Sequence, residues 1–171
     1  MEIDFLFIQR MRMGDEKALE VFIEKYYPLI LKYCQVHITD YSYAEDMTQE
    51  TFARFFQNLR KYKHYGKVEN YLYVIAANVC KDYYRKTREI PMEQLPEILD
   101  LSNDNLDIQI DIHNALQSLS NEIREVAILY FLQEQKQKDI SKILGIGLPL
   151  VKYRVRQAKK ILSDYFGKEN V

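Results

Sequence analysis

Gln137-Lys-Asp-Ile-Ser-Lys-Ile-Leu-Gly-Ile-Gly-Leu-Pro-Leu-Val-Lys-Tyr-Arg-Val-Arg-Gln-Ala158 predicts two short helices joined by one tight turn. Gly145 can take the left-handed conformation that ends a helix, and Pro149 suits the first turn of the next one. Apolar residues recur at helical spacing and mark the buried side of both helices: Ile140, Ile143, Leu144, Val151, Val155 and Ala158. The chain is therefore expected to end in a helix-turn-helix.

The second of these helices has a basic front opposite its apolar back. Its other faces carry Lys152, Tyr153, Arg154 and Arg156. Such a helix can sit in the major groove of DNA, because its apolar back packs on the protein while its cations meet the phosphates. A plain helical hairpin with a solvated basic face is the alternative. The positions of the turn glycine, the proline and the cations favour DNA binding.

The composition favours an all-α fold. The 171 residues include 5 Gly and 4 Pro, which is few for a turn-rich β fold. No apolar run approaches the roughly 20 residues that span a bilayer, and the first residues are acidic where a secretion signal is basic. We therefore expect a cytoplasmic protein with one medium domain or two small ones.

The sequence gives little reason to expect catalytic or metal chemistry. Cys34 and Cys80 are too few for a disulfide framework or a metal site, and they predict buried free thiols. His37, His64 and His113 lack ligand spacing and a paired acid. Neither a glycine-rich phosphate loop nor a nucleophile motif is present, so an enzyme with a DNA-binding tail is disfavoured. We expect a protein that is not an enzyme and has no catalytic residues, metal, cofactor or small-molecule substrate.

The formal net charge of −1 hides a strong segregation of charge along the chain. Residues 54–88 hold 9 basic and 2 acidic side chains, and residues 136–171 hold 9 and 3. Between them, residues 89–122 hold 8 acidic side chains and 0 basic ones. Phosphates attract lysine and arginine and repel acids, so the pattern predicts two DNA-facing surfaces joined by a segment that avoids the DNA backbone.

Helical periodicity also predicts the elements before the helix-turn-helix. A first helix starts at Glu16, and Pro28 either kinks it or starts a new one. Ser42 with Glu45 fits a capping box at the start of the next helix, which reaches Leu59. After it we expect a polar loop at 60–67, a helix over 69–85, a linker over 90–109 and further helices from 110 onward.

Two of these helices carry polar faces that suit macromolecular partners. The helix over 69–85 and the loop before it carry a first set: Lys63, His64, Asn78, Lys81, Asp82 and Arg85. Cations beside tyrosines suit the binding of unstacked bases. A solvated amphipathic helix with no partner explains the same pattern equally well. The preceding helix carries a second set: Asp46, Gln49, Glu50, Phe52 and Arg54. That set suits docking to another helix or forms an ordinary charged surface.

Three motifs in series resemble one protein family. They are Ala44-Glu-Asp-Met-Thr-Gln-Glu-Thr-Phe52, then Tyr71-Leu-Tyr-Val-Ile-Ala-Ala-Asn78 with Asp82 and Arg85, then Asp139-Ile-Ser-Lys-Ile-Leu-Gly-Ile146 with Val151-Lys152 and Arg156-Gln-Ala158. Their order and spacing are similar to those of bacterial extracytoplasmic-function (ECF, group IV) RNA polymerase sigma factors. The resemblance covers nearly the whole chain, with a linker where the family has one.

The resemblance implies a role in transcription initiation for each part of the chain. Residues 1–89 correspond to sigma region 2, residues 90–109 to the linker through the RNA-exit path, and residues 110–171 to sigma region 4. The partners implied are the β and β′ subunits of core RNA polymerase, promoter DNA and an anti-sigma factor. Core polymerase would be bound through Asp46, Gln49, Glu50, Phe52 and Arg54. The −10 element would be opened and read by Lys63, His64, Asn78, Lys81, Asp82 and Arg85. The −35 duplex would meet Pro149, Lys152, Tyr153 and Arg156.

Three residues depart from the family pattern. Tyr71 stands where the family usually has Trp, Ser120 where it has Pro, and Leu150 where it has Thr. The last change removes a hydroxyl from the start of the recognition helix. A stand-alone helix-turn-helix regulator remains the alternative function, but it leaves the acidic and aromatic helix over 44–56 without a role and usually needs a dimer face.

Overall fold

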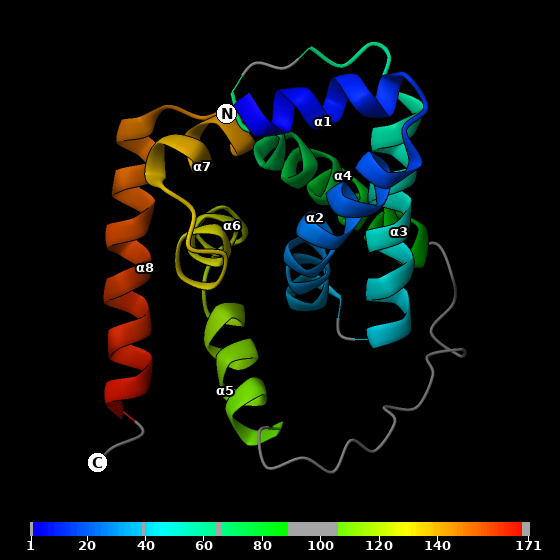
Figure 1. Cartoon of the computed structure of the whole chain (residues 1–171). Coiled ribbons are helices and arrows are strands. Elements are labelled where there is room, and N and C mark those ends of the chain that lie inside the picture. Colours follow the sequence, from blue (N-terminus) through cyan, green and yellow to red (C-terminus); the bar gives the residue numbers. More distant parts are fainter. Residues whose placement is uncertain (1, 39, 64–65, 89–105, 169–171) are drawn as a thin grey trace. The chain divides into compact units, whose positions relative to one another are not determined.

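The computed structural model describes residues 2–38, 40–63, 66–88 and 106–168. The part of the chain that it describes is helical and contains no strand, which confirms the all-α prediction (Figure 1). The chain divides into two compact units, unit 1 over Met1–Leu95 and unit 2 over Pro96–Val171. Most of the expected linker lies outside the described residues, while its last four positions, 106–109, already belong to a helix.

Unit 1 is built from four helices around an aromatic core. They are α1 (Glu2–Arg12), α2 (Glu16–His37), α3 (Tyr41–Gln57) and α4 (Val68–Arg88). Helix α2 contacts the other three, and α3 packs along α4. In the core, the rings of Phe22 and Phe55 stack with their centroids 5.1 Å apart, and the rings of Tyr33 and Tyr73 meet edge to face at 5.4 Å. These large buried aromatic rings fix how α3 and α4 pack on α2.

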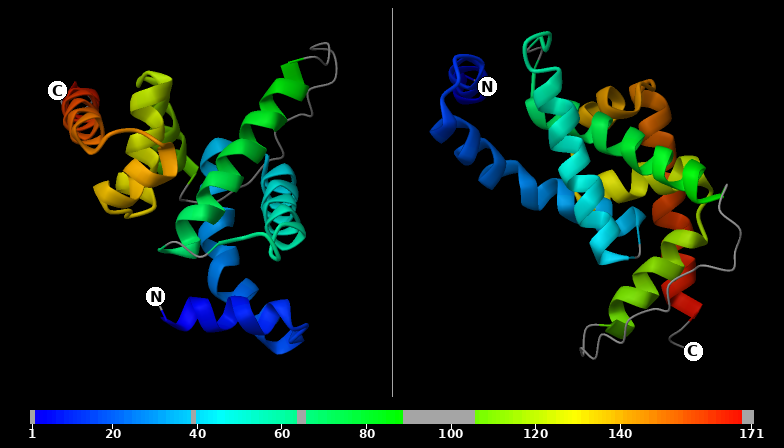
Figure 2. Two further views of the ribbon diagram at one scale, coloured as in Figure 1. Left: turned by 90° about the horizontal axis from the view of Figure 1, so that it is seen from above. Right: turned by 90° about the vertical axis from the view of Figure 1, so that its right-hand side faces the viewer.

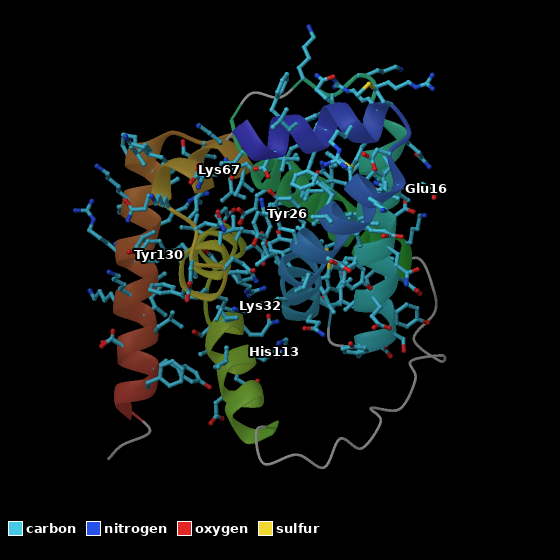
Figure 3. The ribbon with its side chains drawn as sticks, viewed as in Figure 1. Glu16, Tyr26, Lys32, Lys67, His113 and Tyr130 are labelled. Carbon is cyan, nitrogen blue, oxygen red and sulfur yellow. The ribbon has the colours of Figure 1, made fainter. Side chains whose placement is uncertain are left out.

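Helix α1 was missed by the sequence analysis, which placed the first helix at Glu16. It runs crosswise to the start of α2 (Figure 2) and buries Ile8 and Met11. Asp4 Oδ1 accepts hydrogen bonds from Lys25 Nζ at 2.7 Å and from the hydroxyl of Tyr26 at 2.8 Å, and the Tyr26 ring lies inside unit 1 (Figure 3). At its other end, Arg12 donates to the carbonyl of Leu59 at 3.0 Å. Tertiary contacts at both ends therefore hold α1 in place.

One local prediction for unit 1 was wrong, and another is narrowed. Of the two alternatives at Pro28, a new helix is excluded because α2 continues through Pro28 to His37. The buried face of α2 on either side of Pro28 keeps the helix together, although proline removes one backbone hydrogen bond. The cap of α3 is Asp40 rather than Ser42, since an Asp40 carboxylate oxygen accepts from the Tyr43 N–H at 3.2 Å.

Unit 2 contains the predicted helix-turn-helix. Its elements are α5 (Leu106–Gln117), α6 (Asn121–Ala127), the π-helical turn η2 (Ile128–Leu132), α7 (Gln137–Leu144) and α8 (Leu148–Lys168). Helix α8 contacts α5, α6 and α7. Tyr130 lies beside α8 (Figure 3), where Lys159 Nζ is 5.6 Å from the centre of its ring. The buried side of α8 is Val151, Val155 and Ala158, as predicted.

The turn between α7 and α8 depends on Gly145. Its φ of 64° lies in the left-handed region, which glycine adopts without a steric penalty. The Ser141 hydroxyl donates to the carbonyl of Ile146 at 2.6 Å and closes the turn from the other side. This geometry confirms the role predicted for Gly145 and sets the direction in which α8 leaves the turn.

An arginine organises the corner between α5 and α6. The guanidinium of Arg124 donates to the carbonyls of Leu116 at 2.8 Å, Leu119 at 2.9 Å and Gln117 at 3.2 Å. These carbonyls lie at the end of α5 and just after it, where backbone acceptors lack helical partners. The bonds from Arg124 therefore hold the corner in place. Ser120 is the residue that precedes α6, and its side chain makes no capping bond.

Candidate nucleic-acid interface

The exposed side of α8 in unit 2 carries the predicted duplex-binding residues. Pro149, Lys152, Tyr153 and Arg156 are all exposed. Because Val151, Val155 and Ala158 face the core, these four side chains project from the opposite side of one helix. The structure thus brings all four residues of this set together on one basic surface.

The outer side of α4 in unit 1 carries the predicted residues for unstacked DNA. Asn78, Lys81 and Arg85 are exposed, at the spacings that place them on neighbouring turns. Lys63 is exposed in the segment before α4, whereas His64 lies outside the described residues. The start of this segment is anchored, because the ring of Tyr62 stacks on Tyr71 at 4.9 Å. Burial and the neighbouring Tyr71 raise the pKa of Tyr62 to about 12, so this phenol stays neutral.

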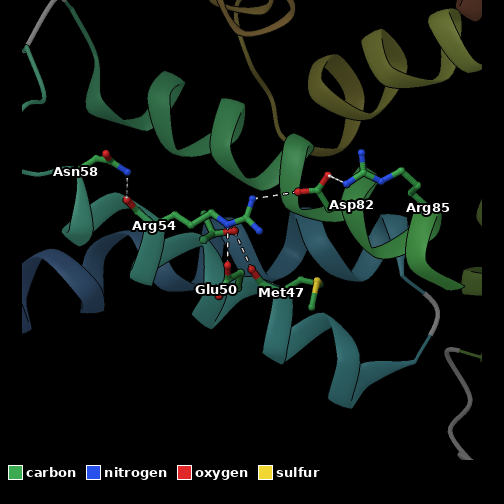
Figure 4. Close-up of polar contacts among 7 residues, drawn as sticks. Met47, Glu50, Arg54, Asn58, Asp82 and Arg85 are labelled. Atoms are coloured by element: carbon green, nitrogen blue, oxygen red, sulfur yellow. Dashed lines mark hydrogen bonds and ion pairs between the residues drawn. The ribbon is translucent and has the colours of Figure 1, made fainter.

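Asp82 occupies a different position from its neighbours on α4. One of its carboxylate oxygens lies 3.2 Å from Arg54 Nη1 on α3, and the other lies 3.3 Å from Arg85 Nη2 (Figure 4). Arg54 Nε in turn lies 2.7 Å from Glu50 Oε1. The result is a chain of alternating charges, Glu50, Arg54, Asp82 and Arg85, that crosses from α3 to α4. Sequence periodicity placed Asp82 beside Asn78 and Arg85, but it could not show this pairing across helices.

The carboxylates of Glu50 and Asp82 both stabilise the charged form of Arg54. The hydrogen bond to Glu50 raises the pKa of Arg54, partial desolvation opposes it, and the hydrogen bond to Asp82 adds to the increase. The guanidinium therefore stays charged at any relevant pH. Its role is geometric: it holds the carboxylates of two helices on one surface.

The outer side of α3 carries part of the second predicted set. Asp46 and Gln49 are exposed, and Glu50 and Arg54 are half-buried beside them. Phe52 is different, because only 5% of it is exposed and its ring stacks on Tyr27 with centroids 5.8 Å apart. Its ring belongs to the core of unit 1, so it supports α3 from within and does not extend the polar surface.

An aromatic contact beside this surface was not predicted. Tyr43, on α3, lies with its ring 5.5 Å from that of Tyr83 on α4, and Tyr83 contacts Tyr84 at 5.6 Å. The Tyr84 hydroxyl donates to the carbonyl of His37. Tyr83 and Tyr84 are neighbours on α4, and only the packing of α3 on α4 brings Tyr43 to them. No sequence spacing signals such a cluster.

Neither a metal-binding cluster nor a membrane-spanning helix occurs among the described residues. That part of the chain holds no group of three or more His, Cys, Asp and Glu side chains that could bind a metal ion. None of its helices is both long enough and apolar enough to cross a bilayer. Cys34 and Cys80 are both buried, as predicted, with their Sγ atoms 4.0 Å apart between α2 and α4.

Sequence comparison matches each unit to part of a known family. Sigma-70 region 2 matches residues 22–90, and Sigma-70 region 4 matches residues 109–162. The ECF RNA polymerase sigma factor SigE of Mycolicibacterium smegmatis is 34% identical over 137 residues, which cover 74% of this chain and 53% of that protein. SigM of Bacillus subtilis, also an ECF RNA polymerase sigma factor, is 30% identical over 131 residues, covering 71% of this chain and 80% of SigM. The matched part of this chain thus spans about half the length of SigE and most of SigM.

A solved structure shares the fold. The sigma factor RpoE from Bartonella quintana, solved in complex with the anti-sigma factor NepR, aligns with a TM-score of 0.71 and 22% sequence identity. The alignment covers 88% of this chain and 98% of that one. The order of helices described above therefore occurs in a protein of known structure.

Proposed function

This chain belongs to the ECF RNA polymerase sigma factors, and from that premise we propose that it binds core RNA polymerase and directs transcription initiation at a specific set of promoters. The observation that carries the proposal is the pair of exposed basic helix faces, α4 in unit 1 and α8 in unit 2. A promoter offers two separate elements, so one protein needs two such faces to recognise both. The two faces belong to separate compact units.

Unit 2 would bind the −35 duplex. Lys152 and Arg156 project from α8 where they can neutralise phosphates, and Pro149 and Tyr153 lie on the same exposed side. Phosphate contacts set the position of a recognition helix, while side chains near its N-terminus reach the base edges. The turn at Gly145 and the buried back of α8 would keep this helix in a fixed orientation on unit 2.

Unit 1 would bind core polymerase and open the −10 element. Asp46, Gln49, Glu50 and Arg54 form the polar surface of α3 that would dock against a helical part of the β′ subunit. Phe52 would contribute by keeping α3 in place from inside the core. Region 2 and region 4 together would also contact the β subunit, with the linker over 90–109 between them.

The −10 surface would be formed by Lys63, His64, Asn78, Lys81 and Arg85. Extruding a base from a duplex costs a few kcal/mol, which contacts to the base and stacking on aromatic side chains can offset. Asp82 is an acid on this surface and repels phosphate, so its effect on DNA would act through Arg85, which it holds at 3.3 Å.

Control by an anti-sigma factor is part of the proposal. RpoE, which has the same fold, was solved bound to its anti-sigma factor. The exposed charged surfaces of both units are the ones that such a partner would need to cover to prevent binding to polymerase and DNA. Polymerase and chromosome share one compartment, so we place the protein in the cytoplasm.

The test is transcription in vitro with core RNA polymerase and fragmented genomic DNA, with and without this protein. We expect discrete start sites that appear only with the protein and share two upstream elements about one to two helical turns apart. Stoichiometric co-purification with core polymerase is the matching binding test. Specific DNA binding without new start sites and without polymerase binding would contradict the proposal and favour a stand-alone regulator.

A further inference from the structure

The start of α8 exposes an apolar stripe beside its basic residues. Leu150 is 40% exposed and Tyr153 is 50% exposed. They are three positions apart, so their side chains are neighbours on one side of the helix. Lys152 and Arg156 are also exposed and lie next to the stripe on one side of it. An exposed leucine in a recognition helix raises the question of what it contacts when α8 binds.

The stripe is held in a fixed orientation. Val151, which lies between the two residues in the sequence, is fully buried. Val155 and Ala158, on the same side of the helix, are buried with it. The Gly147 carbonyl accepts the N–H groups of Leu150 at 3.0 Å and Val151 at 3.1 Å, so Leu150 already lies in the first hydrogen-bonded turn. Leu150 cannot turn inward without unpacking Val151 from the core of unit 2.

The surroundings decide which ligand fits. Lys152 and Arg156 favour an anionic partner, and the N-terminal turn of a recognition helix is the part that reaches base edges in the major groove. Leucine has no hydrogen-bond donor or acceptor, so it cannot read bases through polar groups. The apolar group that a base pair offers in that groove is the C5 methyl of thymine, which cytosine and uracil lack.

We infer that Leu150 and Tyr153 recognise the −35 element by packing against thymine C5 methyl groups, an inference that rests on the proposed function. Leu150 is then a specificity-determining residue, while Lys152 and Arg156 supply affinity that does not depend on sequence. The −35 element should contain at least one A·T pair at the position that Leu150 reaches. Replacing that thymine by deoxyuridine removes one methyl group and changes nothing else at the base edge.

The experiment begins by selecting DNA and then removes methyl groups one at a time. Duplexes are selected from a random pool by the full chain bound to core polymerase and, in parallel, by the full chain alone. Each thymine of the selected −35 element is then replaced by deoxyuridine, and binding is measured for the wild type, Leu150→Ala, Tyr153→Ala and Ile112→Ala. Ile112 is a matched control, because this residue is 38% exposed and belongs to α5, a helix that precedes the helix-turn-helix.

We expect at least one deoxyuridine replacement to weaken wild-type binding about fourfold, the effect of losing one buried methyl group. Leu150→Ala should bind the thymine and deoxyuridine duplexes about equally, whereas Ile112→Ala should keep the wild-type difference. Tyr153→Ala should reduce the penalty at a neighbouring thymine.

Three results would overturn the inference. One is the selection of no duplex sequence in either pool, and another is wild-type binding that is insensitive to every replacement. The third is a Leu150→Ala variant that keeps the full deoxyuridine penalty. Failure of the proposed function looks different: the chain alone would select duplexes and show the methyl dependence, but core polymerase would neither bind it nor start transcription with it.

Discussion

Asp82 is the residue where the two proposed functional surfaces of unit 1 meet. It pairs with Arg54 on the proposed polymerase-binding side and with Arg85 on the proposed DNA-binding side. Its carboxylate is about a third exposed, and ion pairs of this kind contribute at most about 1 kcal/mol to stability. The value of the arrangement therefore lies in orientation: it aims Arg85 and ties it to Arg54, which Glu50 also holds.

Asp82→Asn should show whether Asp82 orients the neighbouring arginines without contributing much to the stability of unit 1. The free energy of unfolding should change by less than about 1 kcal/mol, because a partly exposed pair is lost and the shape of the side chain is kept. Opening of the −10 element, measured by the permanganate reactivity of unpaired thymines, should fall more than the affinity for core polymerase does. Asp111→Asn, the same change at an exposed position of α5, is the control. Equal loss of opening in both variants would argue against a role for the pairing.

The two proposed surfaces predict opposite patterns of loss. Lys152→Ala and Arg156→Ala should weaken binding to the −35 duplex, each lowering the slope of log affinity against log salt by about 1, with polymerase affinity unchanged. Asp46→Ala and Gln49→Ala should lower polymerase affinity and leave duplex binding by unit 2 unchanged. Titrations at several salt concentrations against labelled duplex and against core polymerase measure both. Loss of polymerase binding in the first pair would show that the surfaces are assigned incorrectly.

The periodicity of the sequence predicted which side chains are exposed better than it predicted which side chains contact one another. The predicted exposure of Lys152, Arg156 and Lys81 agrees with the structure because a 3.6-residue repeat determines which face a side chain occupies. The burial of Phe52 against Tyr27 and the pairing of Asp82 with Arg54 depend on a second helix. A single-helix pattern contains no information about that second helix.

At the scale of elements, α1 shows what the sequence pattern lacks. Its exposed Phe5 and Leu6 blur the apolar periodicity, and its position depends on contacts made by residues far along the chain. Asp4 is the main polar anchor on α2. Burial works against the charged form, but hydrogen bonds from Lys25 and Tyr26 outweigh it and lower the pKa of Asp4.

Asp4→Asn should therefore destabilise unit 1 in a pH-dependent way. At neutral pH we expect a loss of about 1 kcal/mol, the typical value of such hydrogen bonds. Because the pKa of Asp4 is lower in the folded state than in the unfolded chain, the stabilisation is complete above the unfolded value of about 3.9. It is lost as the pH falls through the lower folded pKa. Urea unfolding of wild type and variant should thus differ at pH 7 and converge in strong acid, and a difference independent of pH would contradict this account.

The start of α3 offers a direct comparison of two capping candidates. Asp40→Ala should cost about 1 kcal/mol, because it leaves the Tyr43 N–H without its acceptor. Ser42→Ala, inside the first turn and exposed, should stay within about 0.5 kcal/mol of the wild type. Chemical denaturation of both variants measures the difference. The capping-box pattern was misleading because an aspartate two positions earlier takes the capping role.

At the scale of the whole molecule, charge segregation was a good guide to organisation. The basic stretches at 54–88 and 136–171 supply α4 and α8, which belong to different compact units. The helix-turn-helix was predictable because its turn depends on one glycine and its faces on simple periodicity. The corner held by Arg124 was not predictable, because one side chain there serves three carbonyls on a neighbouring segment.

The buried pair of thiols allows the opening of unit 1 to be followed chemically in the intact protein. Cys34 and Cys80 are the two cysteines of the chain, and both lie in the core of unit 1 with their sulfur atoms 4.0 Å apart. A water-soluble alkylating reagent reaches them only when that core opens. Mass spectrometry over time should therefore show the unmodified chain giving way to the doubly labelled chain, with little singly labelled product. Opening of unit 2 exposes no cysteine and adds no label. The opening kinetics of unit 1 can therefore be followed without removing unit 2.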